Sequence, residues 1–158
     1  MITLECASLK GFLDCASLAV SGGRACVVLT ETEFEKNLLL RIFTGLTRLD
    51  SGKIFLFGKE LSSLSSTELN SARKRIGIVP NNGGLVSNLK VWENIMLPLS
   101  YHSSLSHHGM DEKMISILGK IGYDDDIAVL PGPLPVYKKR LAGLTRAMLM
   151  DPDLIIYD

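Results

Sequence analysis

The sequence has no excess of charge of either sign and no apolar run long enough to cross a membrane. Its 158 residues carry 17 Lys plus Arg and 17 Asp plus Glu, which gives a formal net charge of +0 at pH 7. A balanced charge provides no long-range attraction to nucleic acid or anionic lipid, so no nucleic-acid partner is expected. No stretch approaches the roughly 18 to 20 apolar residues of a spanning helix. The N-terminus also lacks the long apolar region of a secretory signal, so we expect a globular, cytoplasmic chain.

Cysteine is scarce, and the three cysteines are Cys6, Cys15 and Cys26. They are odd in number, scattered and without the spacing of metal ligands. Such cysteines are typical of small buried side chains in a reducing compartment. The sequence also has no internal repeat and no low-complexity tract. With 46% apolar residues, a chain of this length is expected to bury one core and to form one domain over residues 1–158.

Apolar runs and turn residues predict strands that alternate with helices. Strands are expected at 2–6, 18–20, 24–29, 53–57, 76–79 and 154–158, and helices at about 36–46, 65–74, 91–101, 111–121 and 138–150. The run at 24–29 is short and apolar and follows Gly22 and Gly23, which is typical of a buried strand. This alternation predicts an α/β fold with a mostly parallel sheet and a helical insertion over about 85–140.

The segment TETEFEKN, residues 30–37, lies between the strand expected at 24–29 and a helix. Strand, loop, lysine and helix is the layout of the phosphate-binding pattern G-x-x-x-x-G-K-[ST]. On that pattern Thr30 and Glu35 occupy the two glycine positions. Lys36 is the lysine, and Asn37 stands where a Ser or Thr is expected. The segment therefore has the layout of a phosphate loop without its glycines.

The charges of this loop leave two interpretations open. Glu31, Glu33 and Glu35 would oppose an anionic ligand. One carboxylate about 5 Å from a phosphate charge costs about 3 kcal/mol at an effective dielectric near 20. In the first interpretation, Lys36 still binds a β-phosphate. In the second, the segment is a helix start whose acids lie favourably at the positive end of the helix.

Five segments together resemble the nucleotide-binding domain of ABC transporters, in order along essentially the whole chain. They are 39–46, 50–59, 75–79, 91–95 and 146–158, and the last resembles the helix that runs into the Walker B motif. The resemblance implies a P-loop NTPase-like (ABC ATPase) fold with a helical subdomain at about 85–140. It also implies ATP and Mg²⁺ as cofactors and a membrane permease as partner. The segments Gly83-Gly84-Leu85 and 93–99 are most similar to the Mla/Mce-type lipid-transport branch.

The resemblance assigns further site residues, and several depart from the family's pattern. Phe12 lies near the place of an aromatic that stacks on adenine, with an ordinary core Phe as the alternative. Asn81 stands at the Q-loop glutamine, and Asp158 at the Walker B aspartate that holds Mg²⁺ through water. Asn37 is a second candidate Mg²⁺ ligand through its amide oxygen. The signature motif falls on 134–138, which has neither its serine hydroxyl nor its glycines.

The family continues beyond the Walker B aspartate with a catalytic glutamate, a D-loop and a switch histidine. The three histidines here, His102, His107 and His108, lie on the insertion and cannot stand in for that histidine. They are expected to be solvated loop residues, with a metal pair as the remote alternative. We therefore expect a cassette that is incomplete at the C-terminus. Uncovered apolar surface near its last strand would make it marginally stable and prone to associate, or dependent on a partner.

These features predict a degenerate ABC-type ATP-binding subunit that does not hydrolyse ATP and docks on a permease through residues 81–100. It would lie in the cytoplasm at the inner face of the membrane, with a homodimer or a second ABC subunit as further partner. One alternative is a genuine ATP-binding and ATP-hydrolysing transporter subunit, of which this chain is a fragment. The other is a regulatory or binding module without nucleotide. No catalytic residue is assigned.

Overall fold

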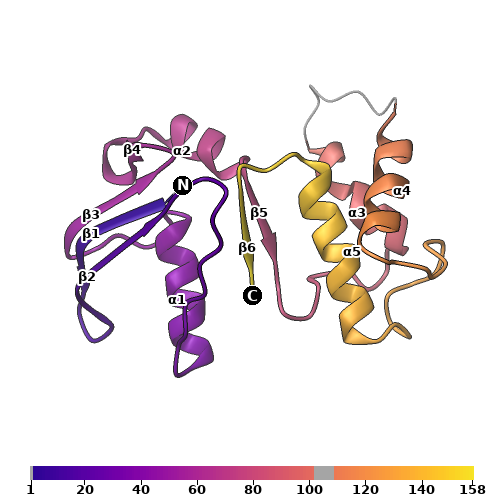
Figure 1. Cartoon of the computed structure of the whole chain (residues 1–158), viewed down its shortest axis with the longest axis horizontal. Coiled ribbons are helices and arrows are strands. Elements are labelled where there is room, and N and C mark those ends of the chain that lie inside the picture. Colours follow the sequence, from indigo (N-terminus) through magenta and orange to yellow (C-terminus); the bar gives the residue numbers. More distant parts are fainter. Residues whose placement is uncertain (1, 102–108) are drawn as a thin grey trace. The chain divides into compact units, whose positions relative to one another are not determined.

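The computed structural model describes residues 2–101 and 109–158. It divides into two compact units, Met1–Lys74 and Arg75–Asp158 (Figure 1). Each unit has its own sheet and its own helices, and they are described in turn.

An antiparallel sheet forms the centre of the first unit. Its strands are β1 (Ile2–Leu9), β2 (Leu13–Val20), β3 (Ser51–Leu56) and β4 (Lys59–Glu60), in the order β2-β1-β3-β4. Ile2 pairs with Leu56 and Leu4 pairs with Ile54, and all four side chains are buried. Because directly opposed residues share one face of a sheet, these pairs place the core of the unit on that face.

Two α-helices and one short 3-10 turn complete the first unit. They are α1 (Glu33–Phe43), the turn Leu61–Ser63 and α2 (Ser66–Arg73). Ile42 of α1 is fully buried, and Leu61 is also buried. The helix expected at about 36–46 is therefore present, but it begins three residues earlier, at Glu33. The helix expected at 65–74 is confirmed, with Ser65 as its N-cap.

The expectation of a buried strand at 24–29 is wrong. Residues 24–30 form neither helix nor strand, and no strand of the described sheets pairs with them. Val27 is 84% exposed and Leu29 is 89% exposed. A short apolar run becomes a buried strand only where it pairs with neighbouring strands and is covered, and none of the described strands pairs with this run.

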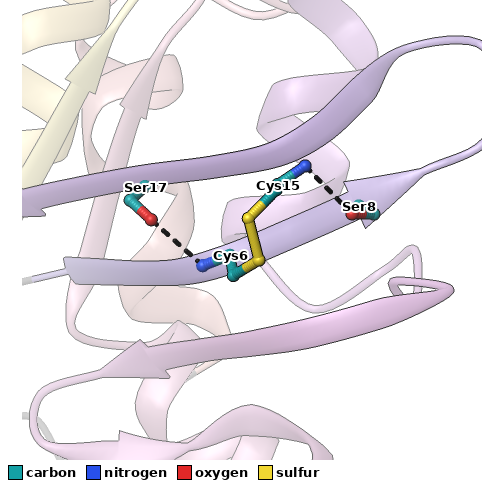
Figure 2. The surroundings of a disulfide bond; sticks show 4 residues. All are labelled: Cys6, Ser8, Cys15 and Ser17. Carbon is teal, nitrogen blue, oxygen red and sulfur yellow. Dashed lines mark hydrogen bonds between the residues drawn. A yellow bond between two sulfur atoms is a disulfide. The ribbon is translucent and has the colours of Figure 1, made fainter.

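The cysteines also differ from expectation. Cys6 and Cys15 are bonded to each other, and both are exposed (Figure 2). Cys26 is exposed as well and is not in a disulfide. The prediction of three buried thiols is therefore wrong. The prediction failed because it inferred burial from the residue type alone. Cys26 lies in the exposed segment 24–29, which pairs with no described strand.

The second unit combines a pair of parallel strands with three helices. The elements are β5 (Ile76–Val79), α3 (Val91–Ser100), α4 (Met110–Lys120), α5 (Val136–Leu149) and β6 (Leu154–Tyr157). The three helices lie together in Figure 1, and β5 runs beside β6. Apolar side chains of the helices form a continuous core, which includes Val91, Ile95, Leu99, Met114, Ile117, Leu118, Ala142 and Leu149.

The sequence predicted the elements of this unit closely, but the sheets differ from expectation. β5 has the expected bounds, and the three helices begin within two residues of theirs. In the described residues, however, three of the four strand pairings are antiparallel and only β5–β6 is parallel. β6 was also expected to be buried on both faces, yet Ile155 is 40% and Tyr157 is 53% exposed. Its alternation of half-buried and exposed residues is that of a strand covered on one face only.

Candidate functional site

The predicted phosphate loop is organised as the capped start of α1. Thr32 is the N-cap, and its hydroxyl oxygen accepts a hydrogen bond from the Glu35 backbone N–H at 3.2 Å. The Glu35 carboxylate in turn accepts from the N–H groups of Glu31 at 2.8 Å and Thr32 at 3.2 Å. This reciprocal arrangement is a capping box, which satisfies donors that the first turn of a helix leaves without partners.

The capping box uses donors that a phosphate loop offers to its ligand. In such a loop, consecutive backbone N–H groups point at the phosphates. Here two of these groups, on Glu31 and Thr32, bond the chain's own Glu35 carboxylate. A carboxylate and a phosphate cannot share the same donors, because both are anions. The loop in this conformation therefore does not fit a nucleotide phosphate.

Lys36 and Asn37 lie on the first turns of the same helix. The Lys36 ammonium forms an ion pair with the Glu33 carboxylate, and the Lys36 side chain is only 28% exposed. Its backbone N–H donates to the carbonyl oxygen of Thr32 at 3.2 Å. Asn37 is exposed on α1. The lysine charge that would face a phosphate is thus directed at a neighbouring acid.

Phe12 lies at the tip of the β1–β2 hairpin, in the same unit as Lys36. Its backbone N–H donates to the carbonyl oxygen of Leu9 at 2.9 Å, which closes the turn between the two strands. The Phe12 side chain is half-buried. It is therefore neither a fully buried core residue nor a fully exposed stacking platform.

In the second unit, the structure brings Asn81 and Asp158 to one edge of a sheet. Val79 at the end of β5 pairs with Tyr157 at the end of β6, and the two strands are parallel. The Asp158 backbone N–H also donates to the carbonyl oxygen of Val79 at 2.9 Å. Asn81 and Asp158 thus follow the carboxyl ends of adjacent parallel strands, which is where open α/β sheets bind ligands.

The loop after β5 is held firmly by α5. The Arg140 guanidinium donates to the carbonyl oxygen of Asn81. Arg146 donates to the carbonyl oxygens of Gly84 at 2.8 Å and Gly83 at 3.2 Å, and its burial lowers the pKa of its guanidinium. An ideal Cβ placed on Gly143 of α5 would lie 2.5 Å from the Gly83 carbonyl oxygen, so the two backbones are in close contact.

The following segment, 86–90, is fixed by one buried amide. Asn94 of α3 is 0% exposed, and its side chain bonds backbone groups of Val86, Leu89 and Lys90 at 2.7 to 3.1 Å. Val86 and Trp92 nevertheless keep apolar side chains exposed, at 41% and 39%. The segment therefore combines a rigid backbone with exposed apolar side chains.

The predicted signature segment, 134–138, forms the start of α5. Pro135 is its N-cap, and the side chains of Val136 and Tyr137 are exposed. The Lys138 side chain is 14% exposed, and its ammonium pairs with Asp125 at 2.6 Å and Asp124 at 3.0 Å. These hydrogen bonds raise the pKa of Lys138 and lower the pKa of Asp124.

A family model described as ABC transporter matches residues 13–158. The chain belongs to the ABC transporter family. The intermembrane phospholipid transport system ATP-binding protein MlaF of Haemophilus influenzae is 28% identical over 145 residues, which are 92% of this chain and 55% of that protein. The methionine import ATP-binding protein MetN of Mannheimia succiniciproducens is 31% identical over 146 residues, 92% of this chain and 42% of that protein. The chain thus spans about half the length of these relatives.

Solved ABC cassettes share the fold. One is the dimeric post-hydrolysis state of the ATP-binding cassette MJ0796, bound to ADP and Pi, with a TM-score of 0.81 and 20% sequence identity. The match covers 100% of this chain and 73% of the MJ0796 chain. Another is the cbiO1 protein of Clostridium perfringens, part of the ABC transporter complex cbiONQ, with a TM-score of 0.85 and 18% sequence identity. This match covers 99% of this chain and 64% of the cbiO1 chain. The predicted α/β, P-loop NTPase fold of the ABC ATPases is therefore confirmed.

Within residues 2–101 and 109–158, no three His, Cys, Asp or Glu side chains gather in a way that could hold a metal ion. His102, His107 and His108 lie outside the described residues. Among the helices that the structure describes, none is long and apolar enough to cross a membrane.

Some residues that organise these loops of the ABC-family chain were missed in the sequence. The pattern Thr32-x-x-Glu35 is itself a capping-box signal, and it was hidden because the same residues were aligned with a phosphate loop. Asn94 and Arg146 were noted only as parts of similar segments. No local signal distinguishes them, because their partners lie on other elements of the fold.

Proposed function

We propose that this chain is a degenerate ABC-type ATP-binding subunit that does not hydrolyse ATP and docks on a membrane permease. It lies in the cytoplasm, held at the inner face of the membrane by that permease, and pairs with a second copy or another ABC subunit. The proposal includes one cassette domain over residues 1–158 with a helical subdomain at about 85–140.

The single observation that carries the proposal is the capping box at Thr32 and Glu35. The Glu35 carboxylate accepts hydrogen bonds from two backbone N–H groups of the loop, and the Glu33 carboxylate forms an ion pair with the Lys36 ammonium. A nucleotide would have to displace a carboxylate that is covalently part of the loop and therefore always present. It would also have to tolerate the remaining negative charge nearby, at about 3 kcal/mol for each carboxylate.

Docking on a permease is supported by the loop and helix at 81–100. Arg146 and Asn94 fix the backbone of this segment, and Val86 and Trp92 present apolar side chains from it. A rigid backbone with exposed apolar side chains suits an interface, since little conformational entropy is lost on binding. By likeness to MlaF, we propose a lipid as the transported substrate, with a small import substrate such as methionine as the alternative offered by MetN.

The test is a calorimetric titration of the purified chain with Mg-ATP. We expect no measurable binding at sub-millimolar nucleotide. Replacing Thr30 and Glu35 by Gly and Asn37 by Ser restores the phosphate-loop pattern and should raise the affinity. A wild-type dissociation constant in the low micromolar range would contradict the proposal and favour a genuine ATP-binding subunit.

A second pair of variants separates the charge of Glu35 from its structural role. Glu35→Gln removes the charge but keeps a side chain that can still occupy the Glu31 and Thr32 N–H groups. It relieves only the charge repulsion, so nucleotide binding should strengthen less than in the restored-loop variant. Glu68→Gln is the matched control, because Glu68 forms the same box with Ser65 at the start of α2. We expect Glu68→Gln to change the stability of the chain about as much as Glu35→Gln does, and to leave nucleotide binding unchanged.

Hydrolysis is tested by phosphate release. Turnover requires an activated water and groups that stabilise charge on the γ-phosphate. No residue of the described loops is assigned to these roles, so we expect no turnover. ATPase activity that Lys36→Ala abolishes would favour the hydrolysing alternative, whereas activity insensitive to that change would indicate a contaminant. Absence of nucleotide binding in the restored-loop variant would favour the nucleotide-free binding module.

A further inference from the structure

We propose that Cys6 and Cys15 form a reversible disulfide that locks the β1–β2 hairpin according to the redox state of its surroundings. The two cysteines lie on neighbouring strands and are bonded to each other (Figure 2). Both residues are exposed, so a thiol reagent can reach them from solvent. Exposed disulfides are typical of labile or regulatory bonds.

The hairpin is irregular where the disulfide crosses it. Regular pairing of β1 with β2 is interrupted between Leu4 and Ala7, the interval that contains Cys6, and again between Ala7 and Leu9. Cys6 and Cys15 have φ angles of 42° and 45°, a region that residues with a Cβ rarely adopt. The backbone at this crossing therefore has an unfavourable conformation at both cysteines.

Two serine hydroxyls stabilise the same crossing. The backbone N–H of Cys6 donates to the hydroxyl oxygen of Ser17 at 3.1 Å, and that of Cys15 donates to Ser8 at 3.0 Å (Figure 2). These side chains take the place of ladder partners that the bulge removes. The disulfide and the serines thus act together at the crossing, and breaking the disulfide leaves the two exposed serine hydrogen bonds and the interrupted strand pairing to hold it.

The chemistry is thiol–disulfide exchange. In the oxidising direction, the thiolate of one cysteine attacks glutathione disulfide and releases one glutathione thiolate, which leaves a mixed disulfide. The second cysteine then displaces the remaining glutathione and closes the Cys6–Cys15 bond. The two cysteines lose two electrons and two protons in total, and two molecules of glutathione are formed. An excess of glutathione reverses both steps.

The hairpin tip is the part that the lock controls. The disulfide closes a loop that contains Lys10 and Phe12, and its ends are 9 residues apart. The Lys10 backbone N–H donates to the Asp50 carboxylate at 2.7 Å, and the Asp50 N–H donates to the carbonyl oxygen of Ser8 at 2.9 Å. Reduction lets Cys6 and Cys15 leave their positive φ angles and thereby loosens this turn. Any effect on adenine through Phe12, and the cytoplasmic setting in which the bond would act, rest on the proposed function, whereas the bond itself and the two tests below do not.

The location proposed above makes reversibility the natural role for this bond. Disulfides in cytosolic proteins are rare, and those that form are mostly transient or redox-sensing. A permanent structural bridge would not persist in that compartment. An exposed pair that closes a small hairpin is suited to respond to a change in the thiol pool.

The first test equilibrates the purified chain in glutathione buffers of graded redox ratio, traps thiols with a maleimide and measures intact mass. We expect one label on the oxidised chain, at Cys26, and three on the reduced chain, with a reversible transition between them. Cys26→Ser should give zero and two labels, which shows that Cys26 takes no part. Three labels at every ratio, or one label that persists in excess dithiothreitol, would overturn the proposal.

The second test is limited trypsin digestion of the oxidised and reduced chain. Lys10 is exposed at the hairpin tip, so cleavage there should be several-fold faster after reduction. Cleavage at the exposed Lys120, in the second unit, is the internal control and should not respond. The double variant Cys6→Ser/Cys15→Ser should be cleaved at the reduced rate in every buffer. Equal cleavage at Lys10 in the oxidised and reduced wild-type chain would overturn the lock, and neither measurement uses nucleotide.

Discussion

The side-chain amide of Asn94 bonds both backbone groups of Val86. Its oxygen accepts from the Val86 N–H at 2.7 Å, and its nitrogen donates to the Val86 carbonyl at 3.0 Å. The same nitrogen also donates to Leu89 and Lys90, so one buried residue organises a whole turn of the chain before α3. This segment is the one proposed to meet a permease.

The first prediction concerns the stability that this amide provides. Asn94→Ala removes the side-chain partners of the Val86 N–H and the Leu89 carbonyl oxygen. Each part-buried backbone group left without a partner costs about 1 to 3 kcal/mol. We expect a total loss of about 2 to 4 kcal/mol in the free energy of unfolding, measured by urea denaturation. Asn82→Ala is the matched control, since Asn82 is exposed and accepts a single bond from the Gly84 N–H. A change below about 0.5 kcal/mol is expected there, and equal effects at the two sites would contradict the argument.

The second prediction uses two helical glycines. An ideal Cβ on Gly143 would lie 2.5 Å from the Gly83 carbonyl oxygen, whereas one on Gly119 would have no atom within 4 Å. Gly143→Ala should therefore push the loop at Gly83 away from α5 and destabilise the chain by about 1 to 3 kcal/mol. Gly119→Ala should stabilise α4 by about 0.5 kcal/mol. Thermal unfolding of the two variants measures this, and a Gly143→Ala chain as stable as wild type would refute the close contact.

The third prediction concerns acid. The hydrogen bond from Lys138 lowers the pKa of Asp124 below its unfolded value of about 3.9. The stability from this bond is therefore present above about pH 4 and is lost as the pH falls through the lowered pKa. Lys138→Met should lower the melting temperature at neutral pH and reduce the further loss on acidification. Lys139→Met is the control, because Lys139 donates to the Gly132 carbonyl, which does not titrate.

If the acid-induced loss were the same in Lys138→Met and wild type, the Asp124 bond would not contribute to the pH dependence. Thermal melts at several pH values between neutrality and about pH 2 distinguish the two outcomes. Other carboxylates with lowered pKa values contribute to the same window, among them Asp153 through its bond with Arg75. The prediction therefore concerns the difference between variants rather than the whole acid transition.

The fourth prediction concerns the exposed run at Val27 and Leu29. These side chains are almost fully accessible and lie two positions apart, so they offer adjacent apolar surface to another chain. We expect the purified chain to bind a hydrophobic dye and to associate at tens of micromolar, as measured by light scattering. Replacing both residues by Ser should reduce both signals. Ile115→Ser is the control, because Ile115 is exposed singly on α4.

A monomer that melts sharply and binds no dye would contradict this prediction. If the double Ser variant instead associates as strongly as wild type, the association must involve other exposed side chains. Ile155 and Tyr157 on β6 are then the next residues to change, since both are exposed on one face of that strand.

The sequence predicted those elements whose signals are local. β5 was predicted at its observed bounds, because a short apolar run between turn residues can be recognised from the sequence alone. α2 was expected at about 65–74, and the structure places it at Ser66–Arg73, with a capping box formed by Ser65 and Glu68. The family resemblance, which depends on the order of several segments, was confirmed by the family match and by the fold of solved cassettes.

The failures concern properties that depend on distant parts of the chain. Val27 and Leu29 have the residue types of a buried strand, but burial requires neighbouring strands that the sequence cannot display. The bond between Cys6 and Cys15 depends on how the two strands are aligned across a bulge. Of the candidate site, Asn81 and Asp158 lie at one sheet edge, a proximity that was not predicted from the sequence, and Glu35 forms a capping box that the alignment with a phosphate loop did not indicate.

The parallel pairing of β5 with β6 has a consequence for the order of folding. The ion pair between Arg75 and Asp153, at the start of this ladder, joins residues that are 78 positions apart. Closing so long a loop carries an entropic penalty, whereas α3, α4 and α5 need only local hydrogen bonds to begin forming. The helices should therefore form and collapse on one another before the two strands meet. The sheet edge that carries Asn81 and Asp158 is then expected to be among the last parts of the second unit to form.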